Sequence, residues 1–176
     1  MTTAADGCIT KAEERLRNML AACTTFQTWV GAATADAAKD SIYYTEVPPQ
    51  ARTEDTTPLA YNVSIRPFAL IWTSTSQGFK LHEQLGPSGL LQVRFEDNAR
   101  STDPAEAERL FLNTIGKIMQ SEDTDNPGLL ELSITRQYTQ IREMEIVSVF
   151  HTDEDDHDTY GDAIAAEMSV AWGVVR

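Results

Sequence analysis

Residues 163–175, AIAAEMSVAWGVV, carry the longest alternating pattern in the chain. From Ile164 to Val174 every second residue is apolar, and most positions between them hold small or polar residues. Successive side chains of a strand point to opposite faces of a sheet, so this period of two predicts a long strand with one face on a hydrophobic core. Trp172 belongs to that predicted core face.

Other stretches predict further strands. Residues 41–47 (SIYYTEV) are rich in β-branched and aromatic residues and stop at two prolines. Residues 68–75 (FALIWTST) begin with an almost continuous apolar run, which is typical of a central strand. Residues 130–135 alternate and residues 145–150 are rich in β-branched residues, so both predict strands, while residues 142–144 between them also allow a helix.

Residues 90–96 predict a strand with one face in solvent. Apolar residues occupy the odd positions, and Gln92, Arg94 and Glu96 occupy three of the even ones. We therefore expect the even positions to face water. The preceding residues 77–89 are rich in glycine and include the sequence GPSG, which predicts a loop or hairpin connection ending in a turn.

Residues 10–31 predict an amphipathic N-terminal helix. Thr10 and Glu13 have the spacing of a capping box, and Gly31 is expected to end the helix. A second short helix over residues 32–39 is compatible with the alanines there, as is a loop. The expected buried stripe, with steps of three and four residues, comprises Leu16, Met19, Leu20, Cys23, Phe26 and Val30.

A second long helix is predicted over about residues 103–121. Asp103 is a favourable N-cap, Pro104 suits the first helical position, and Glu106 stands third. This cap also accounts for Asp103 and Glu106 without any catalytic role. The predicted buried face comprises Ala107, Leu110, Phe111, Ile115, Ile118 and Met119.

The order helix, strands, helix, strands does not follow strict βαβ alternation. It predicts the α+β class, with a largely antiparallel sheet and both helices packed on one face. The length of 176 residues fits a single α+β domain covering residues 1–176. Residues 49–58 are polar and bounded by prolines, and we expect them to form a loop.

The net charge of −13, from 27 acidic and 14 basic residues, is the main compositional feature. An acidic surface repels phosphate backbones, so tight nucleic-acid binding is not expected. No apolar run is long enough to span a bilayer, so membrane insertion is not expected either. Cys8 and Cys23 have no metal-binding spacing and suit the reducing cytoplasm.

The most conspicuous cluster of potential ligands is residues 151–158, HTDEDDHD. An EF-hand that begins at Asp153 requires glycine and glutamate at its sixth and twelfth positions, where this chain has Asp158 and Ile164. We therefore expect residues 151–160 to form a solvated acidic loop, with cation binding as the open alternative. The remaining histidine, His82, has no partner motif.

No nucleophile elbow, Walker A motif or dinucleotide fingerprint occurs. The sequence predicts no catalytic, cofactor-binding or metal-binding residue and no cofactor. Trp29, Trp72 and Trp172 are expected in the core. Arg94, Arg136 and Arg142 are expected on or near exposed strand faces, where basic side chains in an acidic chain favour contacts between copies.

The whole layout resembles the tail-terminator and neck proteins of long-tailed phages. The resemblance rests on the following segments in order: LRNMLAACTTFQTWV, SIYYTEVPP, FALIWTST with GLLQVRFED, DPAEAERLFLNTIGKIM, and AIAAEMSVAWGVV. It implies a non-enzymatic protein that forms a homo-oligomeric ring, caps the tail tube and docks to the head connector. It also implies assembly in the host cytoplasm and a final place in the virion, with residues 49–58 and 151–160 as candidate contact loops.

The residues alone leave two other functional classes open. A cytoplasmic adaptor could bind another protein through an exposed sheet edge. A small-molecule-binding module or enzyme would need a pocket between sheet and helix, with polar groups that converge on it. A deep pocket lined by His82 or His151 with two carboxylates would favour the second class.

Overall fold

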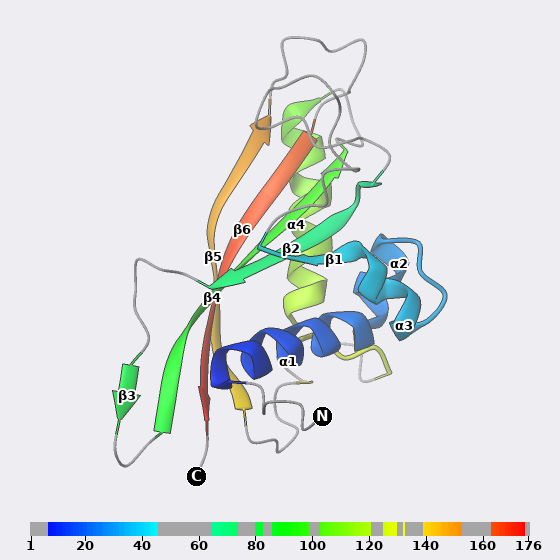
Figure 1. Cartoon of the computed structure of the whole chain (residues 1–176). Helices are drawn as coiled ribbons and strands as arrows, with labels where there is room; N and C mark the ends of the chain where they lie inside the picture. Colours follow the sequence, from blue (N-terminus) through cyan, green and yellow to red (C-terminus); the bar gives the residue numbers. More distant parts are fainter. Residues whose placement is uncertain are drawn as a thin grey trace, which may run out of the picture.

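The computed structural model describes residues 7–45, 65–73, 80–82, 86–98, 103–120, 125–129, 132, 139–152 and 163–174. Helices and strands follow one another in the order expected for the α+β class, which is confirmed (Figure 1). The elements are α1 (Cys8–Ala22), α2 (Thr24–Trp29), α3 (Ala35–Ala38), the 3-10 turn η1 (Lys39–Ser41), β1 (Ile42–Tyr44), β2 (Phe68–Thr73), β3 (Lys80–His82), β4 (Gly86–Asn98), α4 (Pro104–Met119), β5 (Thr139–Thr152) and β6 (Ala163–Val174).

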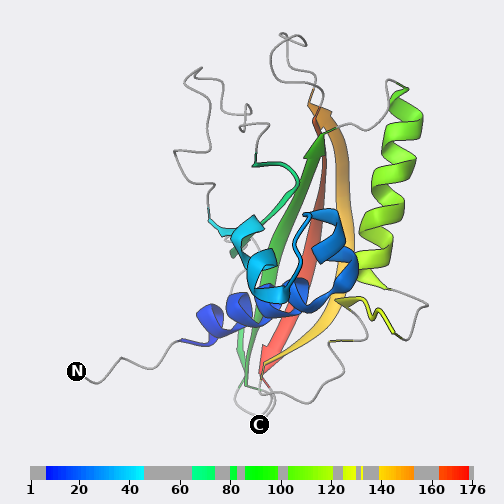
Figure 2. The ribbon, with the colours of Figure 1, turned by 90° about the vertical axis from the view of Figure 1, so that its right-hand side faces the viewer.

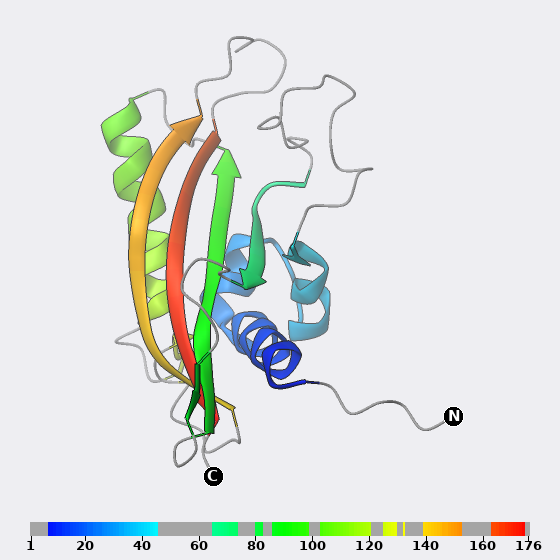
Figure 3. The ribbon, with the colours of Figure 1, turned by 60° about the vertical axis from the view of Figure 1, so that its left-hand side comes forward.

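The described strands form one sheet in the order β1-β2-β4-β6-β5, and β3 pairs with one end of β4. Only the short β1–β2 pair is parallel among these pairings, so the prediction of a largely antiparallel sheet is confirmed. The strands β4, β6 and β5 lie side by side as long curved ribbons (Figure 3).

The helices pack on one face of this sheet, as predicted. Helix α4 runs alongside the long strands, whereas α1 lies across them (Figures 1 and 2). Alternate residues of the strands enter the same core as the buried helix residues, because every second side chain points to this face. The largest buried side chains of this core include Leu16, Leu20, Phe26, Phe95, Ile115, Ile118, Ile164 and Trp172.

The N-terminal helix differs from its prediction at both ends. It begins at Cys8 with Gly7 as N-cap, so the capping box at Thr10 is wrong; packing of Ile9 and Ala12 on the core extends the helix beyond it. An extended residue, Cys23, then separates α1 from α2. The predicted stripe is nonetheless buried on both helices, apart from half-buried Val30.

The predicted stop at Gly31 is confirmed. Its φ is 71°, a left-handed conformation that glycine adopts without the steric penalty of a Cβ. The Gly31 N–H donates to the Thr28 carbonyl and the Ala32 N–H donates to the Gln27 carbonyl, which is the Schellman pattern. Helix α3 follows with Thr34 as N-cap, so the short second helix is also present.

Helix α4 has the cap that its sequence predicts. The Asp103 carboxylate accepts a hydrogen bond from the Ala105 N–H at 3.1 Å, and Pro104 opens the helix. Helix α4 ends at Met119, and Gln120 is its C-cap. Local capping chemistry and an apolar stripe agree here, so the boundaries match closely.

The turn predicted at Gly86 to Gly89 is wrong, because these residues begin strand β4. Ser88 pairs with Lys80 of β3 on one side and with Gly173 of β6 on the other. The hairpin alternative for this region is therefore the one observed. Gly89 serves close packing: a Cβ on it would lie 3.1 Å from the Trp172 ring.

Two other strand predictions need correction. Leu129 and Leu132 lie in a helical turn, in which the Leu132 N–H donates to the Gly128 carbonyl. A helical spacing of three residues lets both leucines reach the core. The strand predicted over residues 130–135 is therefore wrong at Leu132, and its other residues lie outside the described part of the chain. Conversely, residues 142–144 are strand and not helix, since Glu143 and Met144 pair with Ala171 and Val170 of β6.

The structure places His151 and Thr152 at the end of β5 and not in a loop. The predicted loop over residues 49–58, the remainder of the acidic run and Arg136 lie outside the described residues. The C-terminal strand is observed over Ala163–Val174, as its alternation predicts.

Candidate functional site

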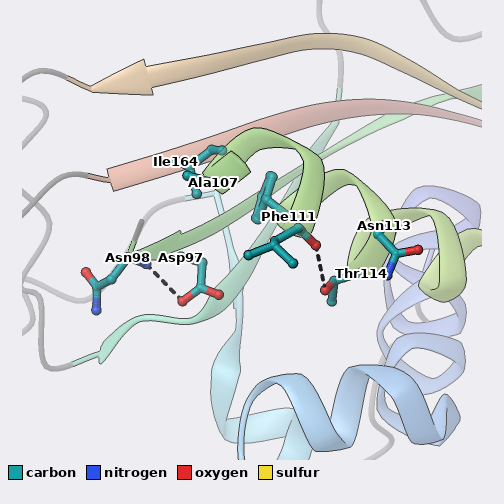
Figure 4. Close-up of a pocket in the computed structure, with 8 residues that line it drawn as sticks. Asp97, Asn98, Ala107, Phe111, Asn113, Thr114 and Ile164 are labelled. Atoms are coloured by element: carbon teal, nitrogen blue, oxygen red, sulfur yellow. Dashed lines mark hydrogen bonds between the residues drawn. The ribbon is translucent and has the colours of Figure 1, made fainter. Parts of the chain in front are cut away.

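A cleft of about 260 Å³ lies between α4 and the ends of β4 and β6 (Figure 4). Residues from all three elements line it: two polar residues at the end of β4, one apolar residue near the start of β6, and both apolar and polar residues of α4. The lining residues are Asp97, Asn98, Ala107, Leu110, Phe111, Asn113, Thr114 and Ile164.

Asp97 is the one charged residue of this lining. Its position follows from the strand period, since residue 97 is on the same face of β4 as Phe95 and so points toward the helices. The residue is only 6% exposed. Its carboxylate accepts a hydrogen bond from the Trp29 indole N–H at 2.9 Å and one from the Asn98 backbone N–H at 2.8 Å.

The apolar part of the cleft comes mainly from α4. Ala107 and Phe111 lie one helical turn apart, so both face the sheet, where Ile164 is the second residue of β6. The Phe111 ring centre lies 6.4 Å from that of Trp29, which connects this wall to the tryptophan that holds Asp97. The Thr114 hydroxyl donates to the Leu110 carbonyl at 3.1 Å within the helix.

A second polar arrangement occupies the opposite face of the sheet. The Glu96 carboxylate contacts the Arg66 guanidinium through Oε1 and the Arg94 guanidinium through Oε2, each at 2.8 Å. The side chains of Arg66 and Glu96 are 0% exposed. Arg66 also donates to the Asn98 side-chain oxygen at 3.3 Å.

These ion pairs correct the prediction of a solvent-exposed face on residues 90–96. Arg94 and Glu96 are buried, because Arg66 from the segment before β2 lies on the same face and a second apolar cluster stands beside it. That cluster consists of Phe68, Leu70, Tyr43, Ile65 and Trp72. A buried Arg94 is accordingly not available as the exposed contact that its alternation suggested.

The two edge strands of the described sheet carry its exposed large hydrophobic side chains. Tyr44 at the end of β1 is 37% exposed, and Val147 of β5 is 59% exposed. The register of β5 on β6 shifts between Ile146 and Ser148, so Val147 is an extra residue at a bulge. Since β1 and β5 are the two ends of the strand order, these side chains lie on opposite edges.

Two opposing effects act on the pKa of Tyr44. Burial raises the pKa of its phenol above the ordinary 10.0, and the nearby Arg17 guanidinium opposes that rise. The Arg17 guanidinium lies 5.5 Å from the centre of the Tyr44 ring, a cation–π distance. Arg17 is held there by donating to the Lys39 carbonyl at 2.9 Å.

The residues singled out from the sequence are dispersed over the fold. His82 is in β3 and His151 is in β5, and neither lines the cleft. Within the part of the chain that the structure describes, no group of three or more potential ligands is placed to hold a metal ion. Trp29 and Trp172 are core residues as predicted, while Trp72 is half-buried on the other face.

Asp97 is not among the residues singled out from the sequence, although the strand alternation indicates that it lies on the core face. The alternation of Leu91, Val93 and Phe95 continues to position 97, which places an acidic residue on a core face. A carboxylate on a core face requires hydrogen-bond partners or a ligand. Its partner Trp29 is distant in the sequence, so only the fold brings the two together.

The fold defines the structural class of the protein: it is an α+β protein whose helices cover one face of a long, largely antiparallel sheet. No family model and no curated protein matches the chain. Among solved structures, it is similar to a chain of a structure described as "Virion of native gene transfer agent (GTA) particle", with a TM-score of 0.39 and 11% sequence identity. The likeness covers 90% of this chain and 96% of the other. None of the described helices has the length and apolar character needed to cross a membrane.

Proposed function

We propose that this protein is a non-enzymatic assembly protein of a phage particle, of the tail-terminator type. In this role it forms a homo-oligomeric ring that caps the tail tube and docks to the head connector. The observation that carries the proposal is the placement of Tyr44 and Val147 on opposite edges of the sheet, both exposed.

A head-to-tail contact requires two different surfaces on opposite sides of each copy. When the β5 edge of one copy meets the β1 edge of the next, each copy uses two distinct patches, and repetition of that contact closes a ring if the rotation allows it. Apolar side chains at such patches favour association because their burial removes them from water. In the proposed ring, Val147 packs on Tyr44 of the neighbouring copy.

The charge of the chain supports the same role. A ring through which DNA passes must not retain it, and a net charge of −13 repels the phosphate backbone. An acidic subunit is therefore suited to line or flank a DNA passage. The polar edge residue Glu145, which is exposed next to the bulge, belongs to this acidic surface.

Cysteine cross-linking between copies tests the ring contact. We would prepare Tyr44→Cys and Val147→Cys variants separately, each in a Cys8→Ser background, mix them and oxidise the mixture. The expected product is a disulfide-linked dimer that forms only in the mixture, and the double variant should give closed oligomers in native mass spectrometry. Equal cross-linking of either variant with itself would contradict a head-to-tail contact.

The oligomeric state of the wild-type protein is the second measurement. Light scattering after size exclusion should give a defined oligomer, and Val147→Asp should shift it toward monomer because a charge would be buried in the contact. Glu145→Gln, at an exposed position close to Val147, is the matched control and should leave the oligomer intact. A strictly monomeric protein at high concentration, also in the presence of tube protein, would rule out the proposed function.

A further inference from the structure

We propose that two bulges in β5 prevent the outer edge of the sheet from pairing with a strand of a second copy of this chain. The bulges lie at Arg142 and Val147, the two residues of β5 that have no counterpart in the register with β6. The inference goes beyond the proposed ring, because it states which kind of contact the β5 edge excludes. Strand addition is blocked, and contacts through side chains are not.

The outer edge of β5 is a long one. β5 is the last strand in the order β1-β2-β4-β6-β5, so among the described strands it pairs with β6 alone (Figure 3). It has 14 residues, whereas β1 at the other end of that order has three. A long edge presents a row of backbone N–H and C=O groups with which another strand can pair. Of the two ends of the sheet, β5 is therefore the one at which strand addition is more favourable.

The sequence of β5 makes strand addition still more favourable. Residues 146–150 are IVSVF, a segment without charge or proline in which every residue except the serine is apolar. Short segments of high β-propensity and low charge are those that form cross-β aggregates. The bulge at Val147 lies inside this segment, and the Val147 side chain is 59% exposed. The ladder is thus interrupted where the sequence most favours its extension to another molecule.

The register shows that both bulges are additions to an otherwise regular pairing. β5 has 14 residues and β6 has 12, and the first and last residues of each strand pair with those of the other. The difference of two residues is accounted for by Arg142 and Val147. An extra residue bends its strand and increases the local twist, so a regular partner strand cannot pair along the whole edge.

The other end of the sheet is protected by its shortness. β1 consists of Ile42–Tyr44, and Thr45 follows it with a φ of 62°. A left-handed residue departs from the extended conformation, so β1 ends at Tyr44. A very short edge strand offers an added strand few hydrogen bonds. The long edge and the short edge are therefore protected by different features, and only the long one requires bulges.

Deletion of Val147 tests the inference directly. Without this residue Ile146 and Val149 keep their β6 partners, so both still face the core and the ladder becomes regular. Wild type should stay soluble on concentration, whereas the deletion variant should be lost from solution as sedimentable material that binds thioflavin T. The deletion removes an exposed apolar side chain, so a purely hydrophobic effect would raise solubility instead. A deletion variant as soluble as wild type would overturn the inference.

Two matched variants identify the bulge as the cause. Val147→Ala keeps the extra residue and shortens its side chain, so it should remain as soluble as wild type. Ser148→Lys, added to the deletion, places a charge on the edge strand opposite Glu167 of β6 and should restore solubility. Aggregation of Val147→Ala would show that the side chain matters and the bulge does not, which would contradict the inference.

Unfolding is the other route to aggregation. The variant without Val147 should therefore show, at low concentration, the far-UV circular dichroism of wild type and a cooperative urea transition. Deletion of Arg142 is the second variant if the first does not fold, because Ile141 and Met144 likewise keep their β6 partners. It should cause the same loss of solubility, and a folded, fully soluble variant would count against the inference.

A peptide probe tests the wild-type protein without any substitution. The fluorescently labelled peptide KEIVSVFK carries the sequence of residues 145–150 between two lysines that keep it soluble. Fluorescence anisotropy should show no binding to the wild-type chain and binding to the chain without Val147. Binding to wild type would show that an edge accepts a strand and would overturn the inference. Ring formation is measured separately by cross-linking, so a wild-type protein that is strictly monomeric would refute the ring and not the protected edge.

Discussion

At the scale of single residues, the most informative side chain is Glu96. Its sequence context gives no sign of burial, yet it holds two arginines on the sheet face away from the helices. Two buried guanidinium groups are tolerated there because the carboxylate lies between them. The negative charge of Glu96 is therefore expected to contribute strongly to the stability of this face.

We predict that Glu96→Gln destabilises the protein by about 3–5 kcal/mol, because it removes the negative charge that contacts two buried guanidinium groups. The free energy of unfolding from urea denaturation is the measurement. The exposed Glu145→Gln variant is the control and should change stability by less than about 0.5 kcal/mol. A small change at Glu96 would mean that water or other groups compensate the arginines.

Gly89 is a second residue whose role is visible only in the structure. We predict that Gly89→Ala destabilises the protein by about 1–3 kcal/mol, because the new Cβ would press on the buried Trp172 ring. Thermal unfolding is a sufficient measurement. Restored stability in a Gly89→Ala variant that also carries Trp172→Phe would identify the ring as the cause, whereas no loss in the single variant would contradict it.

At the scale of elements, two glycines distinguish the effect of backbone conformation from the effect of steric contact. Neither Gly31 nor Gly116 has a neighbouring atom within 4 Å of an added Cβ, so steric contact is not an issue at either position. Gly31 has a left-handed φ of 71° at the end of α2, and Gly116 is in the last turn of α4. The same substitution should therefore act in opposite directions.

We predict that Gly116→Ala stabilises the protein by about 0.5–1 kcal/mol, since alanine loses less conformational freedom in a helix. Gly31→Ala should destabilise it by about 1 kcal/mol, since a Cβ is unfavourable in the left-handed region. Both values come from chemical denaturation under one set of conditions. Changes of the same sign would show that one of the two helix ends differs from the observed geometry.

At the scale of the whole molecule, the acidic charge predicts that the protein does not bind DNA. We expect no retardation of duplex DNA in a gel-shift experiment, even at low ionic strength. Weaker screening strengthens the repulsion between a chain of charge −13 and the phosphates. Retardation that disappears on addition of salt would reveal a basic surface and would contradict the proposed DNA passage.

The whole-molecule view also explains which predictions from sequence succeeded. Helix α4 and strand β6 were correct because each is specified by short-range information: the Asp103-Pro104 cap and an unbroken period of two. The helical turn at Leu132 was mistaken for a strand because a few alternating residues fit either structure. Whether residue 132 is helical or extended depends on how Leu129 and Leu132 reach a core made by distant elements.

The candidate sites depend even more on the tertiary structure. Asp97 meets Trp29 across 68 positions and Glu96 meets Arg66 across 30, so neither contact has a local spacing that sequence patterns reveal. The sequence by itself determined the α+β class, the N-cap of α4 at Asp103, the stop at Gly31 and the acidic character, because propensity, capping and charge act locally or by summation. Only the fold decided which polar residues are buried and which apolar ones stay exposed, because burial depends on what lies opposite in space.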